Sequence, residues 1–211
     1  LFGLFVFYGC RVAGRRREVW LGWLRRPGWV GLGLLAATVF AVWADPFKHK
    51  ILFDEYVLQG TAWHMHETKE ISTPIRAYDF SGTWLVIDAF LDKRPYFYAF
   101  LLSLVHDLTG FRVANAFALN VALTPVCLGL VYWLARQRAG SRGSALLAVA
   151  LLATLPVFDQ NVTGAGMELH NLAMIALVMA VGVLYLRAPD EDRLALLVVG
   201  AVLLAQSRYE S

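Results

Sequence analysis

Cysteine is scarce in this sequence, and the cysteines that are present form no recognisable motif. Cys10 and Cys127 are the only two, and Cys127 lies within a long apolar run. A disulfide between them is therefore not expected, and no CxxC motif or Cys/His spacing of a metal site occurs. The sequence predicts no set of metal ligands and gives no indication of the redox compartment.

Motifs of several large enzyme classes are also missing. The sequence has no glycine-rich phosphate loop, no GxSxG nucleophile elbow and no HExxH pair. It shows no internal repeat beyond a rhythm of apolar segments. None of the enzyme classes that those motifs mark is therefore indicated.

Apolar residues are what the sequence has in excess. They make up 58 % of the chain, and the mean hydropathy is +0.55, whereas soluble domains are roughly 45–50 % apolar. The charges gather in short blocks between apolar runs, as in polytopic membrane proteins. The net charge of +3 is accordingly a topology signal, and it does not indicate a nucleic-acid partner.

Five apolar segments are predicted to span a membrane as helices. Only one reaches the length of about 20 residues that a full span needs, and the others need flanking residues to cross. The predicted spans are Trp29–Ala44, Val113–Ala135, Ser144–Phe158, Leu172–Leu186 and Leu194–Ala205. The expected fold is an all-α polytopic transmembrane helix bundle, with interfacial helices in a long first outer loop over residues 45–112.

The placement of arginines predicts the orientation. Arginines precede the first span, separate the second from the third and separate the fourth from the fifth, and the positive-inside rule makes that side cytoplasmic. Tyr96–Leu108 is apolar but short, and counting it as a span would invert the later loops. It is therefore predicted to lie on the outer face, with Pro95 in its first turn and Gly110 at its end.

The outer loop is predicted to contain smaller elements. Glu55–His66 is expected to form a short interfacial helix. Ser72–Thr83 contains proline, serine and glycine and is interpreted as a turn-rich link, and Trp84–Leu91 as a short apolar stretch.

The first 28 residues are expected to lie on the cytoplasmic side. Leu1–Gly9 is interpreted as part of a membrane helix and Arg15–Arg26 as an amphipathic surface helix. Residues 29–211 then form the transmembrane module. Because the chain starts at Leu1 and stops just after an apolar run, we expect a fragment of a longer protein.

Two acidic positions are candidates for chemistry. Asp54 and Glu55 stand where a surface helix is predicted to begin, and the helix dipole there favours an ionised carboxylate, as a general base or metal ligand requires. An ordinary helix cap is the alternative. Glu168 and His170 stand in a glycine-containing loop that enters a span, where a carboxylate is costly unless it is paired or functional. A solvated loop carboxylate is the alternative there.

Lys93 and Arg94 supply the opposite charge. At the outer membrane face they suit a lipid phosphate, because Lys offers a point charge and Arg can donate two hydrogen bonds at once. Arg208, beyond the last predicted span, is a candidate of the same kind. The alternative is that these long side chains only reach toward the membrane interface.

Taken together, these motifs resemble the GT-C glycosyltransferases, and in particular the branch with protein O-mannosyltransferases, aminoarabinose transferases of lipid A and bacterial lipopolysaccharide-sugar transferases. The resemblance rests on the order of five short motifs. In this sequence they are Asp54-Glu55, Lys93-Arg94-Pro95-Tyr96, Thr109-Gly110-Phe111-Arg112, Arg136–Arg142 and Leu155-Pro156. Many relatives have a second proline where this chain has Tyr96.

The resemblance implies an inverting transferase that moves a sugar from a polyprenyl-phosphate donor in the membrane lipid to an acceptor hydroxyl. It implies a bacterial inner membrane with the site on the periplasmic face. Asp54 would be the general base, Lys93 and Arg94 would stabilise the leaving phosphate, and Glu55 and Glu168 would orient the acceptor or bind a divalent ion. Mg²⁺ or Mn²⁺ is compatible with this mechanism but not required.

Two other functions remain open on the sequence. A polytopic transporter or lipid flippase would place ionisable residues in mid-span and break helices there, whereas the predicted spans carry their charges at their ends. A non-catalytic membrane scaffold with the same fold is the second alternative, and the effect of replacing Asp54 separates it from an enzyme.

Overall fold

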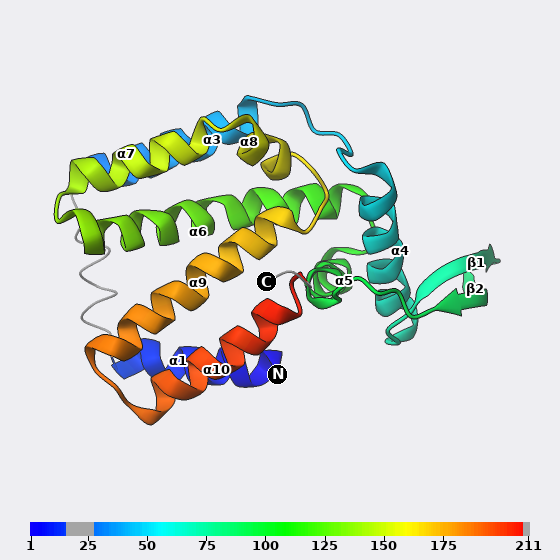
Figure 1. Ribbon diagram of the computed structural model, residues 1–211. Helices are drawn as coiled ribbons and strands as arrows, with labels where there is room; N and C mark the ends of the chain where they lie inside the picture. Colours follow the sequence, from blue (N-terminus) through cyan, green and yellow to red (C-terminus); the bar gives the residue numbers. More distant parts are fainter. Residues whose placement is uncertain (16–27, 209–211) are drawn as a thin grey trace.

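The computed structural model describes residues 1–15 and 28–208, apart from the side chains of Arg15 and Leu52. Most of this part is helical, and a β-hairpin interrupts the helices (Figure 1). In chain order the elements are α1 (Phe2–Arg15), α3 (Gly28–Trp43), α4 (Leu52–Thr68), β1 (Thr73–Phe80), β2 (Thr83–Phe90), α5 (Phe97–Thr109), α6 (Ala114–Ala139), α7 (Arg142–Ala153), α8 (Pro156–Val162), α9 (Glu168–Arg187) and α10 (Glu191–Ala205). The predicted amphipathic helix Arg15–Arg26 lies outside the described residues except for Arg15, which ends α1.

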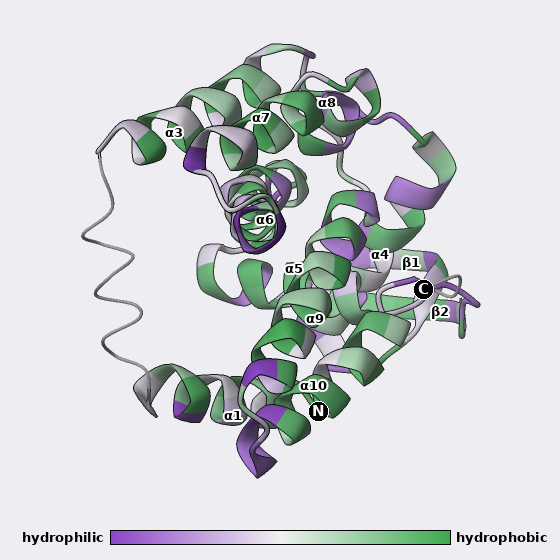
Figure 2. Cartoon of the chain, turned by 60° about the vertical axis from the view of Figure 1, so that its left-hand side comes forward, coloured by the Kyte–Doolittle hydropathy of each residue, from purple (hydrophilic) through white to green (hydrophobic). Residues whose placement is uncertain are grey.

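The bundle is organised around α6. Helices α3 and α7 pack together and against α6, α9 packs against α6 as well, α10 packs on α9, and α1 packs on α10. Buried apolar side chains such as Val30, Leu128 and Val149 close the contact among α3, α6 and α7. Figure 2 shows that most residues of these helices are hydrophobic (green). The bundle therefore presents apolar side chains both inside and outside, as a membrane-embedded protein does.

Helices α6 and α9 are each long and apolar enough to cross a membrane, and α7 and α8 pass the same test as one span bent by 74°. The bend corrects the straight span predicted over Ser144–Phe158. Pro156 stands in the first turn of α8. In a continuous helix the ring of Pro156 would clash with the preceding turn, so α7 ends before it. At the start of α8 the missing N–H of proline costs no hydrogen bond. The other predicted spans correspond to α3 and α10, which have 16 and 15 residues.

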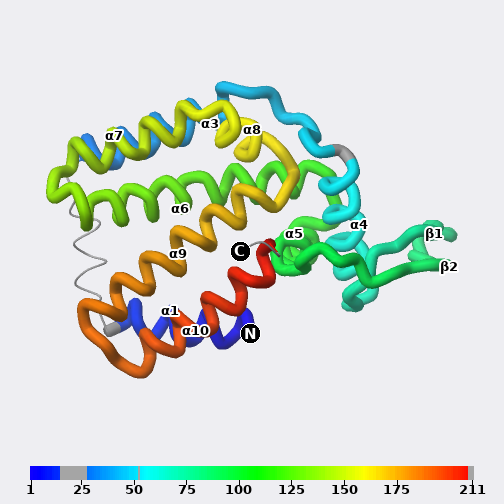
Figure 3. The backbone as a smooth tube through the Cα atoms, in the orientation of Figure 1, coloured from blue at the N-terminus to red at the C-terminus, as the bar shows by residue number. Residues whose placement is uncertain are grey.

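Helices α4 and α5 lie across one end of α6 rather than along it. In Figure 1 the ribbon of α5 is seen nearly end-on while α6 runs within the picture. The predicted helix Tyr96–Leu108 is present with small shifts, because Tyr96 is the N-cap and Pro95 stands outside the helix. Gly110 ends α5 with φ +77° and donates its N–H to His106 O at 2.8 Å. Figure 3 shows the chain returning to this end after α10, where Phe97 N donates to Gln206 O at 3.2 Å.

The β-hairpin corrects the predicted turn-rich link over Ser72–Thr83, and it is a local exception in a structure that is otherwise mostly helical, as expected. Strands β1 and β2 pair antiparallel, with Tyr78 opposite Leu85. Ser81 and Gly82 form the turn, and both have positive φ, 53° and 82°, as the favoured two-residue hairpin turn requires. The side chain of Trp63 on α4 stacks between Trp84 at 4.0 Å and Phe111 at 4.6 Å. This stack attaches the hairpin to α4 and to the end of α5.

We predict that the two ends of α6 face opposite sides of the membrane. A chain with Cys10→Ser and either Ser81→Cys or Ala139→Cys should react with a membrane-impermeant maleimide from opposite sides of sealed vesicles. Both positions are exposed, so the protein itself does not hide either thiol. Labelling of both from the same side would contradict this arrangement.

Candidate functional site

Arg94 connects two carboxylates from different parts of the chain. Its Nη1 donates to Asp92 Oδ2 at 2.6 Å, its Nε donates to Asp54 Oδ1 at 3.2 Å, and its Nη2 also donates to Asp54. Asp54 lies in the first turn of α4, whereas Asp92 and Arg94 lie just before α5. The structure therefore brings together Asp54 and Arg94, which the sequence separates by the whole hairpin.

Further contacts hold the guanidinium of Arg94 in one orientation. Its backbone N–H donates to Asp92 Oδ1 at 3.1 Å, and its guanidinium lies over the ring of Phe53 at 5.3 Å. Partial burial by itself would lower the pKa of Arg94, but hydrogen bonds and negative charge from Asp54 and Asp92 outweigh it and raise that pKa. The cation is therefore permanent, and it is held from two sides.

Asp54 keeps one oxygen available. Both hydrogen bonds from Arg94 end on Oδ1, and within the described residues no donor reaches Oδ2. The side chain is 39 % exposed. It stands at the N-terminal end of α4, where the helix dipole favours negative charge. A carboxylate in this setting is oriented by one oxygen and can accept a proton on the other.

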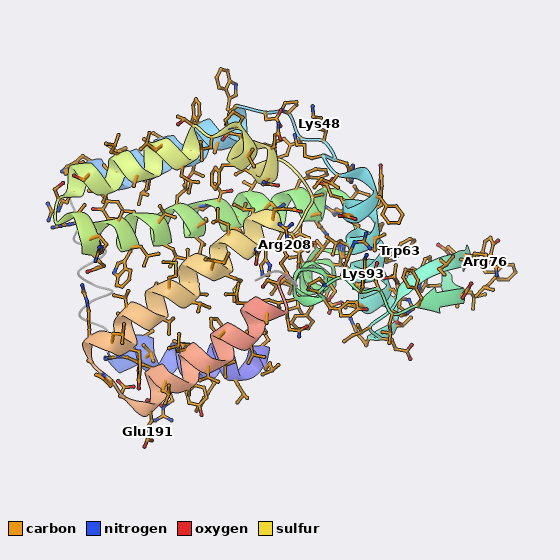
Figure 4. All side chains as sticks on the ribbon, in the orientation of Figure 1. Lys48, Trp63, Arg76, Lys93, Glu191 and Arg208 are labelled. Atoms are coloured by element: carbon orange, nitrogen blue, oxygen red, sulfur yellow. The ribbon has the colours of Figure 1, made fainter. Side chains whose placement is uncertain are left out.

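Two more cations gather near the start of α5. Lys93 is exposed, and no described residue forms an ion pair or hydrogen bond with it. Arg208 follows α10, and its charge acts on Glu168. Figure 4 shows Lys93 and Arg208 at the same end of the molecule, around α5. With Arg94, they give this end of the bundle a group of three positive charges.

Glu55 and Glu168 lie close to each other but differ in exposure. Glu55 is only 2 % exposed, and its oxygens accept hydrogen bonds from Lys50 N at 2.9 Å and Ala165 N at 3.2 Å. A methyl group on Gly166 would lie 2.3 Å from Glu168 Oε2 and 3.6 Å from Glu55 Oε1. Both carboxylates therefore border the same glycine, with Glu55 inside the fold and Glu168 half-buried.

His170 is less accessible than the sequence suggested. It is 2 % exposed and packs against the rings of Phe97 at 4.9 Å and Tyr98 at 5.8 Å. Neither ring nitrogen has a hydrogen-bond partner among the described residues. His170 thus lies behind the charged group rather than within it, so of the predicted site residues it is the one that does not join the others.

Asp92 was not singled out from the sequence, although it belongs to the core of the charged group. Its side chain is 4 % exposed, and an acid directly before a basic pair is the signal that could have indicated it. Across residues 1–15 and 28–208, no group of three or more His, Cys, Asp or Glu side chains is arranged to hold a metal ion. The charged groups at this end of the bundle are carboxylates and fixed cations.

We predict that Arg94→Gln destabilises the protein by about 3 kcal/mol, because it leaves the buried carboxylate of Asp92 without its charged partner. The neighbouring change Lys93→Gln removes the same charge from an exposed side chain and should alter the stability by less than about 0.5 kcal/mol. Thermal unfolding of both variants in detergent micelles measures the difference. Equal melting temperatures would contradict the assigned role of Arg94.

Comparison with known proteins identifies a family for the helical part of the chain. Residues 93–205 match the family model of dolichyl-phosphate-mannose-protein mannosyltransferases, which begins at Lys93 and runs through α5 to α10. No curated protein matches the chain, and no solved structure does. The matched segment is more than half of the 211 residues. The chain therefore belongs to the dolichyl-phosphate-mannose-protein mannosyltransferase family, whose members are membrane glycosyltransferases of the GT-C kind.

Proposed function

We propose that this glycosyltransferase moves a sugar from a polyprenyl-phosphate donor to an acceptor hydroxyl, with inversion at the anomeric carbon. The contact between Asp54 and Arg94 is the observation that carries the proposal. It places a partly exposed carboxylate next to a group of cations, at the end of α6 where α4 and α5 lie crosswise. A base and a phosphate site at one membrane surface are what this reaction needs.

The three cations are suited to the donor phosphate. Lys93 is exposed and has no partner among the described residues, so it can bind a phosphate oxygen without first breaking an ion pair. Arg208 lies near the start of α5, where Phe97 N donates to Gln206 O. Negative charge grows on the phosphate as the bond to the sugar breaks, and fixed cations in a partly dry site stabilise such charge strongly. A divalent ion can serve the same purpose, but this proposal does not require one.

Asp54 is assigned the role of general base. Arg94 holds Oδ1, and Oδ2 has no hydrogen-bond donor among the described residues, so Oδ2 is assigned to the acceptor. The acceptor hydroxyl gives its proton to Oδ2 as its oxygen attacks the anomeric carbon, and the bonding electrons of the sugar leave with the phosphate. Glu168 lies near Asp54 and Arg208, where it is placed to hydrogen-bond acceptor or sugar hydroxyls.

The membrane setting follows from the two ends of α6. Arg136 and Arg138 lie in the last turn of α6, opposite the charged site, and the positive-inside rule assigns that end to the cytoplasm. The proposed site then lies on the non-cytoplasmic face, which in a bacterial inner membrane is the periplasmic face. There the reactive carbon of a lipid-linked sugar lies at the membrane surface.

Asp54→Asn should reduce sugar transfer by at least about 100-fold, because the amide cannot accept the proton. The change is nearly isosteric, so membrane insertion should be retained. Transfer to acceptor is measured with purified full-length protein and a polyprenyl-phosphate sugar, after matching the folded amounts by size-exclusion chromatography. Transfer at the wild-type rate would instead indicate a scaffold that carries no base at this position.

Lys93→Ala should lower kcat/KM for the lipid donor by about 10-fold or more, because one charge-assisted contact to the phosphate is lost. The KM for the acceptor should stay the same. Lys69→Ala is the matched control, since Lys69 is also exposed on the outer loop but pairs with Asp107 at 2.6 Å. An equal effect of Lys93→Ala on donor and acceptor would argue against a phosphate contact.

A further inference from the structure

The chain between α8 and α9 is irregular and buried. Residues 163–167 lack helical structure, yet all of them are buried. Buried backbone groups need hydrogen-bond partners, and an irregular segment cannot supply them itself. Thr163 and Met167, at its two ends, bond to the backbone of Lys48, Asp159 and Asn171. Residues 164–166 between them take their partners from side chains on α4, α5 and α6. Glu168 is the first residue after the segment.

Asn120 supplies the largest share of these partners. Its side chain is fully buried within α6, and its Nδ2 donates to Gly164 O at 2.9 Å and Gly166 O at 3.0 Å. A longer contact of 3.4 Å reaches Asn161 O. An amide inside an apolar helix is costly unless it forms hydrogen bonds. Here Nδ2 donates to carbonyls of the segment that precedes Glu168, whereas Oδ1 has no hydrogen-bond partner among the described residues.

Two further side chains hold the residue between those glycines. Tyr98, fully buried on α5, donates its hydroxyl to Ala165 O at 3.2 Å. Glu55, buried on α4, accepts from Ala165 N at 3.2 Å. The carbonyls of three successive residues and one N–H are thus held by α4, α5 and α6. Helix α4 also carries Asp54, and α5 begins four residues after Lys93. The segment is therefore connected to the proposed active site.

We propose that Asn120 is a positioning residue for Glu168. Together with Tyr98 and Glu55 it fixes the backbone at 164–166, and this backbone sets the place of the Glu168 carboxylate beside Arg208 and Asp54. The assignment rests on the proposed sugar transfer. It makes Glu55 part of the support of the site rather than a contact of the acceptor.

The glycine at 166 shows how closely Glu168 depends on this backbone. The carboxylate folds back until its Oε2 lies 2.3 Å from where a Cβ of residue 166 would be. A side chain there cannot be accommodated with the carboxylate in place, but the carboxylate is the end of a flexible chain and can swing away. Gly166→Ala is therefore a specific way to displace Glu168 at little cost to the fold.

The first test follows the backbone independently of any activity. In full-length protein with Cys10→Ser and Glu168→Cys, the labelling rate of Cys at 168 by a soluble maleimide is compared with and without Asn120→Leu. Loss of two buried hydrogen bonds should change that rate by about five-fold or more. Thr124→Val is the matched control, because Thr124 is equally buried on α6 and donates only to Asn120 O in its own helix. An unchanged rate with Asn120→Leu, or an equal change with Thr124→Val, overturns the proposal.

The second test measures transfer with Glu168 in place. Asn120→Leu and Gly166→Ala should each lower kcat by about 10- to 100-fold with little change in the donor KM, as expected when a site group is misplaced but the phosphate contacts remain. Thr124→Val should keep wild-type kinetics. Wild-type kcat in either of the first two variants overturns the positioning role. If the unaltered protein transfers no sugar, the proposed function fails, whereas the labelling result still decides whether Asn120 holds the segment.

Discussion

The site depends on one ion-pair network, in which Arg94 is shared between Asp92 and Asp54. Asp92 is buried and belongs to the same turn as Arg94, so this pair fixes the guanidinium relative to the start of α5. Asp54 belongs to α4, so the second pair fixes the crosswise helices relative to each other. Without this link a carboxylate and a group of cations would stand on separate segments of a long loop. With it they gather at one end of α6, and the proposed transfer from a lipid-linked phosphate relies on this arrangement.

The same end of the bundle is reinforced from the inside. Asn120, Tyr98 and Glu55 satisfy the buried backbone before Glu168, so that α9 enters the bundle at a defined point. The polar groups of this region therefore fall into two layers. The inner layer bonds to backbone and sets distances, and the outer layer, with Asp54, Lys93 and Arg208, stays accessible. Burial separates the two layers: Glu55 is 2 % exposed, whereas its neighbour Asp54 has a side chain 39 % exposed.

Local sequence signals were sufficient for part of this structure. The surface helix with Asp54 and Glu55 in its first turn and the stop of α5 at Gly110 follow from capping and dipole arguments. The hairpin was missed because Pro74, Ser81 and Gly82 suggested only turns, although β-branched and aromatic residues flank them. The bend at Pro156 was missed because apolar content alone does not distinguish one straight span from two short helices. The adjacent acids Asp54 and Glu55 take different roles because successive residues of a helix point in directions about 100° apart. Glu55 is therefore buried while Asp54 stays exposed, and composition alone does not predict which of the two is buried. Asn120 had a usable signal, because it and Asn115 are amide side chains within the predicted span Val113–Ala135.

The central claim is that the donor phosphate binds among Lys93, Arg94 and Arg208, beside Asp54. Cryo-electron microscopy of the full-length protein in lipid nanodiscs with a polyprenyl phosphate tests this claim most directly. We expect phosphate density in contact with Lys93 and Arg208 at the start of α5, with the lipid chain running along the bundle. Phosphate density at the opposite end of α6, near Arg136 and Arg138, would contradict the account.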